Sequence, residues 1–70
     1  MTGIPLILNG ARVTAAAGTL AELLAERGVD SSQRYIAVAV NNVVVSRGDW
    51  TTMRLAEGDR IEIVQPMKGG

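Results

Sequence analysis

The dipeptide Asn9-Gly10, set between two short segments rich in apolar residues, constrains the fold more than any other feature of the chain. Both residues accept a positive φ, which a type I′ turn requires, and this turn joins two antiparallel strands. The flanking segments, residues 4–8 and 11–15, then become the strands, with Val13 facing the core. The chain is therefore predicted to open with a β-hairpin.

One helix is predicted over residues 20–27. Thr19 and Glu22 form a T-x-x-E capping box at its start, and Gly28 provides the left-handed stop at its end. Between them, three leucines at positions i, i+3 and i+4 make one apolar stripe. Leucines at this spacing are far more often core than site, so we expect the helix to pack on a sheet through them.

The second half of the chain predicts a further strand pair and a final strand. Residues 35–40 and 43–45 flank an Asn-Asn turn, and residues 60–65 alternate apolar and charged side chains. Residues 46–52 lack periodicity, so we expect an irregular crossover there, in which one turn of 3₁₀ helix is an option. Within it, Trp50 is expected to close one end of the core, and Arg47 and Asp49 are interpreted as loop residues that hydrogen-bond the crossover.

The order β-β-α-β-β-β predicts an α+β fold. For so short a chain the β-grasp arrangement is the natural candidate: a mixed sheet of four to five strands with one helix packed on it and the last strand in the middle. Pro66 cannot donate to a strand ladder, so pairing is expected to stop there. We therefore expect a β-grasp domain over residues 1–65 and a flexible tail over residues 66–70.

Composition excludes several classes of function. The 70 residues suffice for one domain, and they include no cysteine and no histidine, which removes the commonest metal ligands, the usual general base and the thiol nucleophile. We predict no metal site and no enzyme. Seven basic and seven acidic residues cancel without a basic stripe, which argues against nucleic-acid binding. No apolar run is long enough to span a membrane, and no positive charge precedes residues 4–8, so a cytoplasmic protein is expected.

The last two residues, Gly69 and Gly70, have no side chains and could thread a channel too narrow for anything larger. They would deliver the carboxylate of Gly70 to the active site of another protein. The simpler interpretation is a frayed end, since termini are usually disordered. The tail alone does not decide between the two.

The middle of the chain carries the most specific resemblance. Residues 39–50 read AVNNVVVSRGDW, which resembles the A-[IV]-N-x-x-[IV]-V-x-R-x-x-W pattern of the thiamine-biosynthesis sulfur carrier family, ThiS, a ubiquitin-like β-grasp family. The Asn-Gly turn, the A-G-T-x-x-E-L-L helix start and the E-G-D turn before the last strand are also similar to this family. The related small subunit of molybdopterin synthase shares the fold and tail but generally has a different middle segment.

The resemblance implies a sulfur carrier and not an enzyme. An E1-like adenylyltransferase of the ThiF type would use ATP to adenylate the Gly70 carboxylate, and a persulfide donor would convert it to a thiocarboxylate. A thiazole synthase of the ThiG type would then take the sulfur. In this scheme the carrier binds no cofactor of its own, Gly70 is the reacting residue and Gly69 provides clearance.

The partners must also bind the domain. The strand faces that carry Ala37, Ala39 and Val64 are candidates for an exposed apolar patch beside the root of the tail, which Met67 could extend. Single exposed apolar residues are also ordinary on protein surfaces, and both interpretations stay open. Lys68 could approach the nucleotide phosphates during adenylation, although a solvated lysine is the commoner case.

Three alternatives remain at this stage. The chain could carry sulfur for another pathway, such as molybdopterin synthesis. It could instead be a ubiquitin-like modifier attached to lysines through Gly70. A β-grasp interaction module with an incidental Gly-Gly end is the third, and it predicts that deleting Gly69 and Gly70 changes nothing.

Overall fold

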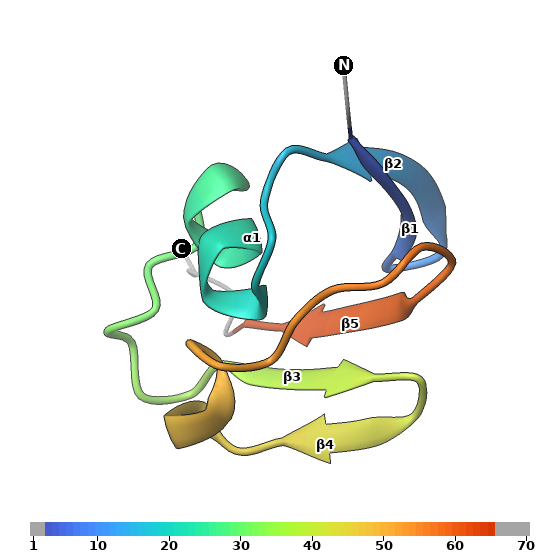
Figure 1. Ribbon diagram of the computed structural model, residues 1–70. Helices are drawn as coiled ribbons and strands as arrows, with labels where there is room; N and C mark the ends of the chain where they lie inside the picture. The colour runs from blue at the N-terminus through green and yellow to red at the C-terminus, as the bar shows by residue number, and fades with distance from the viewer. Residues whose placement is uncertain (1–2, 66–70) are drawn as a thin grey trace, which may run out of the picture.

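One five-stranded sheet and one helix make up the fold of residues 3–65, which are the residues described by this computed structural model. The sheet curls around the helix (Figure 1). In chain order the elements are β1 (Ile4–Leu8), β2 (Ala11–Ala15), α1 (Leu20–Glu26), β3 (Ala37–Val40), β4 (Val43–Val45), a 3₁₀ turn (Arg47–Asp49) and β5 (Arg60–Val64).

The sheet has the strand order β2-β1-β5-β3-β4, so the last strand lies in the middle. β1 and β5 run parallel, and every other neighbouring pair is antiparallel. This confirms the predicted α+β fold: a mixed β-grasp sheet with one helix packed against it. It also means that the strand leading to residues 66–70 is the central one of the five.

Both hairpins form through the predicted turns. Asn9 and Gly10 have φ values of 49° and 86°, and Asn41 and Asn42 have values of 52° and 70°. Two successive positive φ angles define a type I′ turn, whose twist matches that of the strands it joins. Asparagine tolerates this left-handed region better than most residues because its short side-chain amide can form hydrogen bonds with nearby groups.

The helix and two strands are slightly shorter than predicted. The capping box of Thr19 and Glu22 forms, but the helix ends at Glu26, and Arg27 is its C-cap. β3 starts at Ala37 and β5 ends at Val64, not at residues 35 and 65. Ala37 and Val64 form the last pair of the β3–β5 ladder. Strand geometry therefore stops where the hydrogen-bonding partner stops.

Two glutamates of the helix hold the segment that leads into it. The Glu26 carboxylate accepts from the backbone N–H groups of Ala16 and Ala17, both at 3.0 Å. The Glu22 carboxylate accepts from Gly18 and Thr19, at 2.9 and 3.1 Å. Four consecutive N–H groups between β2 and α1 thus bond to the carboxylates of these two glutamates. The bond from Thr19 belongs to the predicted capping box, and the other three were not predicted.

The free energy of unfolding should fall at acid pH as the Glu22 carboxylate becomes protonated. The N–H groups of Gly18 and Thr19 lower the pKa of its carboxyl below its usual range. Its ionised form therefore stabilises the folded chain above the unfolded-state pKa, and this contribution is lost as the pH falls through the folded-state pKa. We expect urea midpoints to fall less steeply between about pH 5 and about pH 3 for Glu22→Gln than for the native chain.

Glu57→Gln is the control for that measurement, since Glu57 lies in the exposed turn before β5 and accepts no hydrogen bond in residues 3–65. We expect the urea midpoints of Glu57→Gln to change with pH as those of the native chain do. If Glu22→Gln also followed the native chain, the carboxylate would not be responsible.

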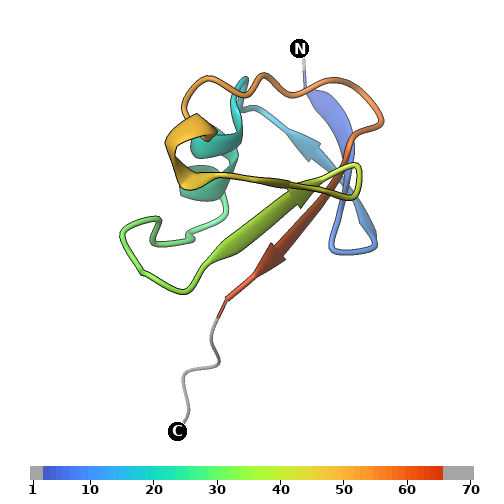
Figure 2. The same ribbon diagram turned by 90° about the horizontal axis from the view of Figure 1, so that it is seen from below.

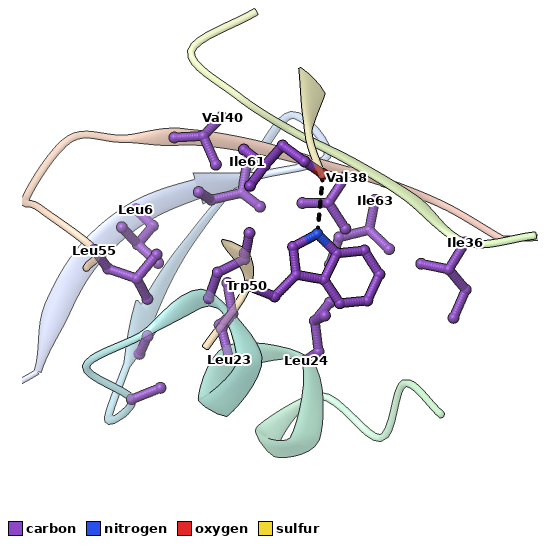
Figure 3. Close-up of a cluster of buried hydrophobic side chains, with 14 residues drawn as sticks. Leu6, Leu23, Leu24, Ile36, Val38, Val40, Trp50, Leu55, Ile61 and Ile63 are labelled. Carbon is purple, nitrogen blue, oxygen red and sulfur yellow. Dashed lines mark hydrogen bonds between the residues drawn. The ribbon is translucent and has the colours of Figure 1, made fainter. Parts of the chain in front are cut away.

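The core lies between the helix and the inner face of the sheet (Figure 3). The three helix leucines are fully buried, which confirms them as core. Trp50 is 3% exposed, and its indole Nε1–H donates to the C=O of Val45 at 3.0 Å. The prediction that Trp50 closes one end of the core is correct. Its single polar atom is satisfied by the strand next to it.

Candidate functional site

The chain leaves the sheet from the end of its middle strand. β5 lies between β1 and β3 and ends at Val64, and the sequence continues from there to Gly70 (Figure 2). The predicted site residues Met67, Lys68, Gly69 and Gly70 lie outside the described residues. What the structure can place is the root of this segment and the surface around it.

The structure brings together the three predicted surface residues inside residues 3–65. Ala37 of β3 lies directly opposite Val64 of β5, and Ala39 follows two residues later on the same face of β3. Because side chains alternate along a strand, all three lie on the face turned away from the helix. Val64 is 63% exposed, Ala37 is exposed and Ala39 is half-buried.

Val44 belongs to this surface although the sequence analysis did not single it out. It lies opposite Ala39 in the β3–β4 ladder and is 75% exposed. Directly opposed side chains on one face of an antiparallel pair are in contact range. We call the four residues Ala37, Ala39, Val44 and Val64 the outer patch.

An exposed aromatic residue lies just before the outer patch in the chain. Tyr35 is 74% exposed and precedes Ala37 by two residues. Tyrosine is enriched in protein interfaces because it joins a large apolar ring to a polar tip. The exposure of Val44 depends on the strand register, and Tyr35 lies in the loop before β3, so the sequence analysis identified neither residue.

Charged residues border the outer patch along β5. Glu62 lies opposite Ala39, and Arg60 begins the strand. Both side chains are exposed. An apolar centre beside charged residues is the usual composition of a protein docking surface.

Arg47 and Trp50 support a neighbouring loop and make no chemical site. The Arg47 guanidinium donates to the C=O groups of Ser31 and Gln33 and lies 4.6 Å from the centre of the Trp50 ring. The Arg47 side chain therefore bonds to the loop between α1 and β3, whereas its C=O accepts from the N–H of Trp50 within the crossover, as expected. The R-x-x-W pattern joins the crossover to the loop that carries Tyr35. Asp49 bonds within the crossover, where its C=O accepts from the N–H of Met53.

The other half of the sheet holds an open hollow of about 440 Å³, lined by residues of β1, β2 and the turn before β5. Arg12 and Glu57 bring opposite charges to it, around an apolar floor that includes Pro5 and Ile7. Across residues 3–65, no group of three or more acidic, cysteine or histidine residues gathers as metal ligands would. Nor is any helix in this part of the chain long and apolar enough to cross a membrane.

Comparison with known proteins agrees with these observations. In fold, the chain is similar to the crystal structure of a thiamine biosynthesis protein (ThiS) from Geobacter metallireducens, with a TM-score of 0.77 and 27% sequence identity over 96% of this chain and 100% of that one. The NMR solution structure of a thiamine biosynthesis protein from the same organism gives the same TM-score and identity, over 96% of this chain and 88% of that one.

At the level of sequence, no curated protein matches the chain. The model of the ThiS family, in contrast, matches residues 6–70, from the first strand through both terminal glycines. The chain belongs to the ThiS family.

Proposed function

We propose that this protein is a cytoplasmic sulfur carrier for thiazole formation in thiamine biosynthesis, with the carboxyl group of Gly70 as the site of loading. One observation of the structure carries the proposal. The middle strand of the sheet ends in the exposed outer patch, and six residues later the sequence ends in Gly-Gly. Membership of the ThiS family and the similarity to two thiamine biosynthesis proteins support it.

The chemistry begins with activation, because a carboxylate is a poor electrophile at neutral pH. An E1-like adenylyltransferase of the ThiF type joins the Gly70 carboxylate to the α-phosphate of ATP and releases pyrophosphate. The terminal sulfur of a donor persulfide then attacks the carbonyl carbon, and AMP leaves. A thiol cleaves the S–S bond of this acyl disulfide, which gives the Gly70 thiocarboxylate and a disulfide on the donor side.

The thiocarboxylate is a good nucleophile, and a thiazole synthase of the ThiG type takes the sulfur from it. The carrier needs neither cysteine nor histidine, since the sulfur is held by the chain terminus and the partners provide the catalytic groups. Gly69 would let the chain pass a narrow channel in each partner. ATP is used by the activating enzyme, and the carrier holds no cofactor.

Docking would place the outer patch of the carrier against each partner. Extended backbone reaches about 3.3–3.6 Å per residue, so the six residues after Val64 can place the Gly70 carboxylate about 20–22 Å from the end of β5 at most. A partner that receives Gly70 therefore comes within this distance of Val64, and we expect it to cover the surface beside that residue. Met67 and Lys68 lie along that path in the sequence and would meet the same partners.

Intact-protein mass spectrometry tests the proposal. The protein is incubated with ATP, an active ThiF-type enzyme and a persulfide source. We expect a mass gain that matches the exchange of one oxygen for one sulfur, and no gain for a chain that lacks Gly70. Gly69→Ala should load more slowly, because a methyl group enters the channel.

The two main alternatives predict other results. A ubiquitin-like modifier would form conjugates with lysine-bearing proteins in cell extract. An interaction module would stay at its original mass with an enzyme that loads another carrier. Either result in place of the sulfur exchange would overturn the proposal.

A further inference from the structure

The two edges of β5 are paired to different lengths. On the β3 side, residue pairs continue to the end of the strand, where Val64 lies opposite Ala37. On the β1 side, only Arg60 and Ile61 have partners in the parallel ladder. The last backbone bond on this side runs from the N–H of Asn9 to the C=O of Ile61, at 2.9 Å. Beyond that point β1 turns away into its hairpin.

A side chain continues the β1 edge where the backbone leaves it. The Asn9 amide oxygen Oδ1 accepts from the N–H of Ile63 at 2.8 Å, and Nδ2 donates to the C=O of the same residue at 3.4 Å. The amide thus offers Ile63 one acceptor and one donor, which in a parallel ladder would come from two different residues of the neighbouring strand. This contact joins residues 54 positions apart in the chain.

Residue 9 must meet two requirements at once. Its backbone has a φ of 49°, which the turn needs, and its side chain must both donate and accept toward Ile63. Glycine meets the first requirement without the second. Asparagine meets both.

We propose that Asn9 is a positioning residue for the reacting end of the chain: its amide holds the β1 edge of β5 at Ile63 and so fixes where and in which direction the chain leaves the sheet toward Gly70. After Ile63, the ladder with β3 ends at the very next residue, Val64. Within residues 3–65, the Asn9 amide therefore makes the last hydrogen bonds on the β1 side of β5. The effect on loading rests on the function proposed above, whereas the effect on the root itself does not.

The molecule contains a matched control at the opposite end of the same strand. Asn41 also begins a type I′ turn, with a φ of 52°. Its Oδ1 accepts from the N–H of Arg60 at 3.0 Å, and its Nδ2 donates to Asp59 at 3.0 Å. Asn9→Gly and Asn41→Gly therefore keep a residue suited to positive φ and remove two side-chain hydrogen bonds each. Only Asn9→Gly removes hydrogen bonds beside the root of the tail.

The test compares these two variants by NMR and by kinetics. In Asn9→Gly, amide exchange at Ile63 should speed up roughly tenfold relative to amides that exchange by global opening, and the backbone order parameters of Val64 and Gln65 should fall. In Asn41→Gly the faster exchange should be at Arg60, with the order parameters of Val64 and Gln65 unchanged.

The kinetic test uses an active ThiF-type enzyme. The KM for Asn9→Gly should rise about five- to tenfold at nearly constant kcat, and Asn41→Gly should behave as the native chain.

Two results would overturn the proposal. One is an Asn9→Gly variant with native exchange at Ile63 and native order at Gln65. The other is an equal rise of KM in both variants, which would indicate general destabilisation and not positioning. If the native chain itself were not adenylated, the proposed function would fail, and the NMR comparison would still decide whether Asn9 holds the root of the tail.

Discussion

Replacing Trp50 by alanine should lower the free energy of unfolding by about 3–5 kcal/mol. A domain of this length is stabilised by about 4–10 kcal/mol in total, at 0.05–0.15 kcal/mol per residue. The loss is therefore between about a third and the whole of the native stability. The large effect is expected because the indole fills one end of a core with few other large side chains, in a chain that has no phenylalanine.

Trp50 also connects the core to an edge strand and to a neighbouring loop. Its Nε1–H bonds to Val45 in the edge strand, and its ring lies beneath Arg47, which in turn binds the loop between α1 and β3. Removing the ring therefore loosens β4 and that loop together. Trp50→Phe keeps much of the apolar volume but loses the hydrogen bond, and it should cost about 1–3 kcal/mol.

Urea unfolding followed by circular dichroism measures both variants, since Trp50 is the sole tryptophan and its fluorescence is lost with it. The expected order of midpoints is native, Trp50→Phe, Trp50→Ala. A loss of less than about 1 kcal/mol for alanine would contradict the core role, because that is the range of ordinary surface changes.

The parts of the fold that sequence predicted well are those in which interacting residues are neighbours in the chain. The Asn9-Gly10 turn and the Thr19–Glu22 capping box each lie within four residues, so a single short window contains both partners. The central position of β5 followed from the order of elements and from the β-grasp arrangement typical of short chains. These features needed no knowledge of register.

The parts that sequence did not predict depend on residues that are far apart. The contact between Asn9 and Ile63 spans 54 positions, and neither residue signals the other. The same holds for Arg47, whose loop partners lie 14 and 16 residues earlier. In each case a polar side chain forms hydrogen bonds with backbone groups of a strand or loop that is not paired with another strand there.

The outer patch shows why a surface site is harder to predict than a core. Val43, Val44 and Val45 are identical residues in sequence, and only the pairing register tells them apart. Val45 lies opposite Val38 and is buried, whereas Val44 lies opposite Ala39 on the outer face. The sequence analysis identified Ala37, Ala39 and Val64, but it could not include Val44 before the partner strand was known.

Val64→Asp should weaken binding to the activating enzyme by about tenfold or more without destabilising the fold. The side chain of Val64 lies in the outer patch and is 63% exposed, so a carboxylate there is well hydrated in the free carrier. In the complex it would be buried against an apolar surface without a partner, which costs about 1–3 kcal/mol by the range seen for unpaired polar groups in proteins. Isothermal titration calorimetry with a ThiF-type enzyme measures the loss directly.

Val43→Asp is the matched control for that experiment. Val43 is 65% exposed, but it lies opposite the buried Val40, so its side chain is on the helix side of the sheet and outside the outer patch. Both variants put the same charge on an equally exposed valine, and both should unfold within about 0.5 kcal/mol of the native chain. Only Val64→Asp should lose affinity. Equal losses would point to net charge as the cause, and an unchanged affinity for Val64→Asp would mean that partners recognise Gly69 and Gly70 without contacting this face of the sheet.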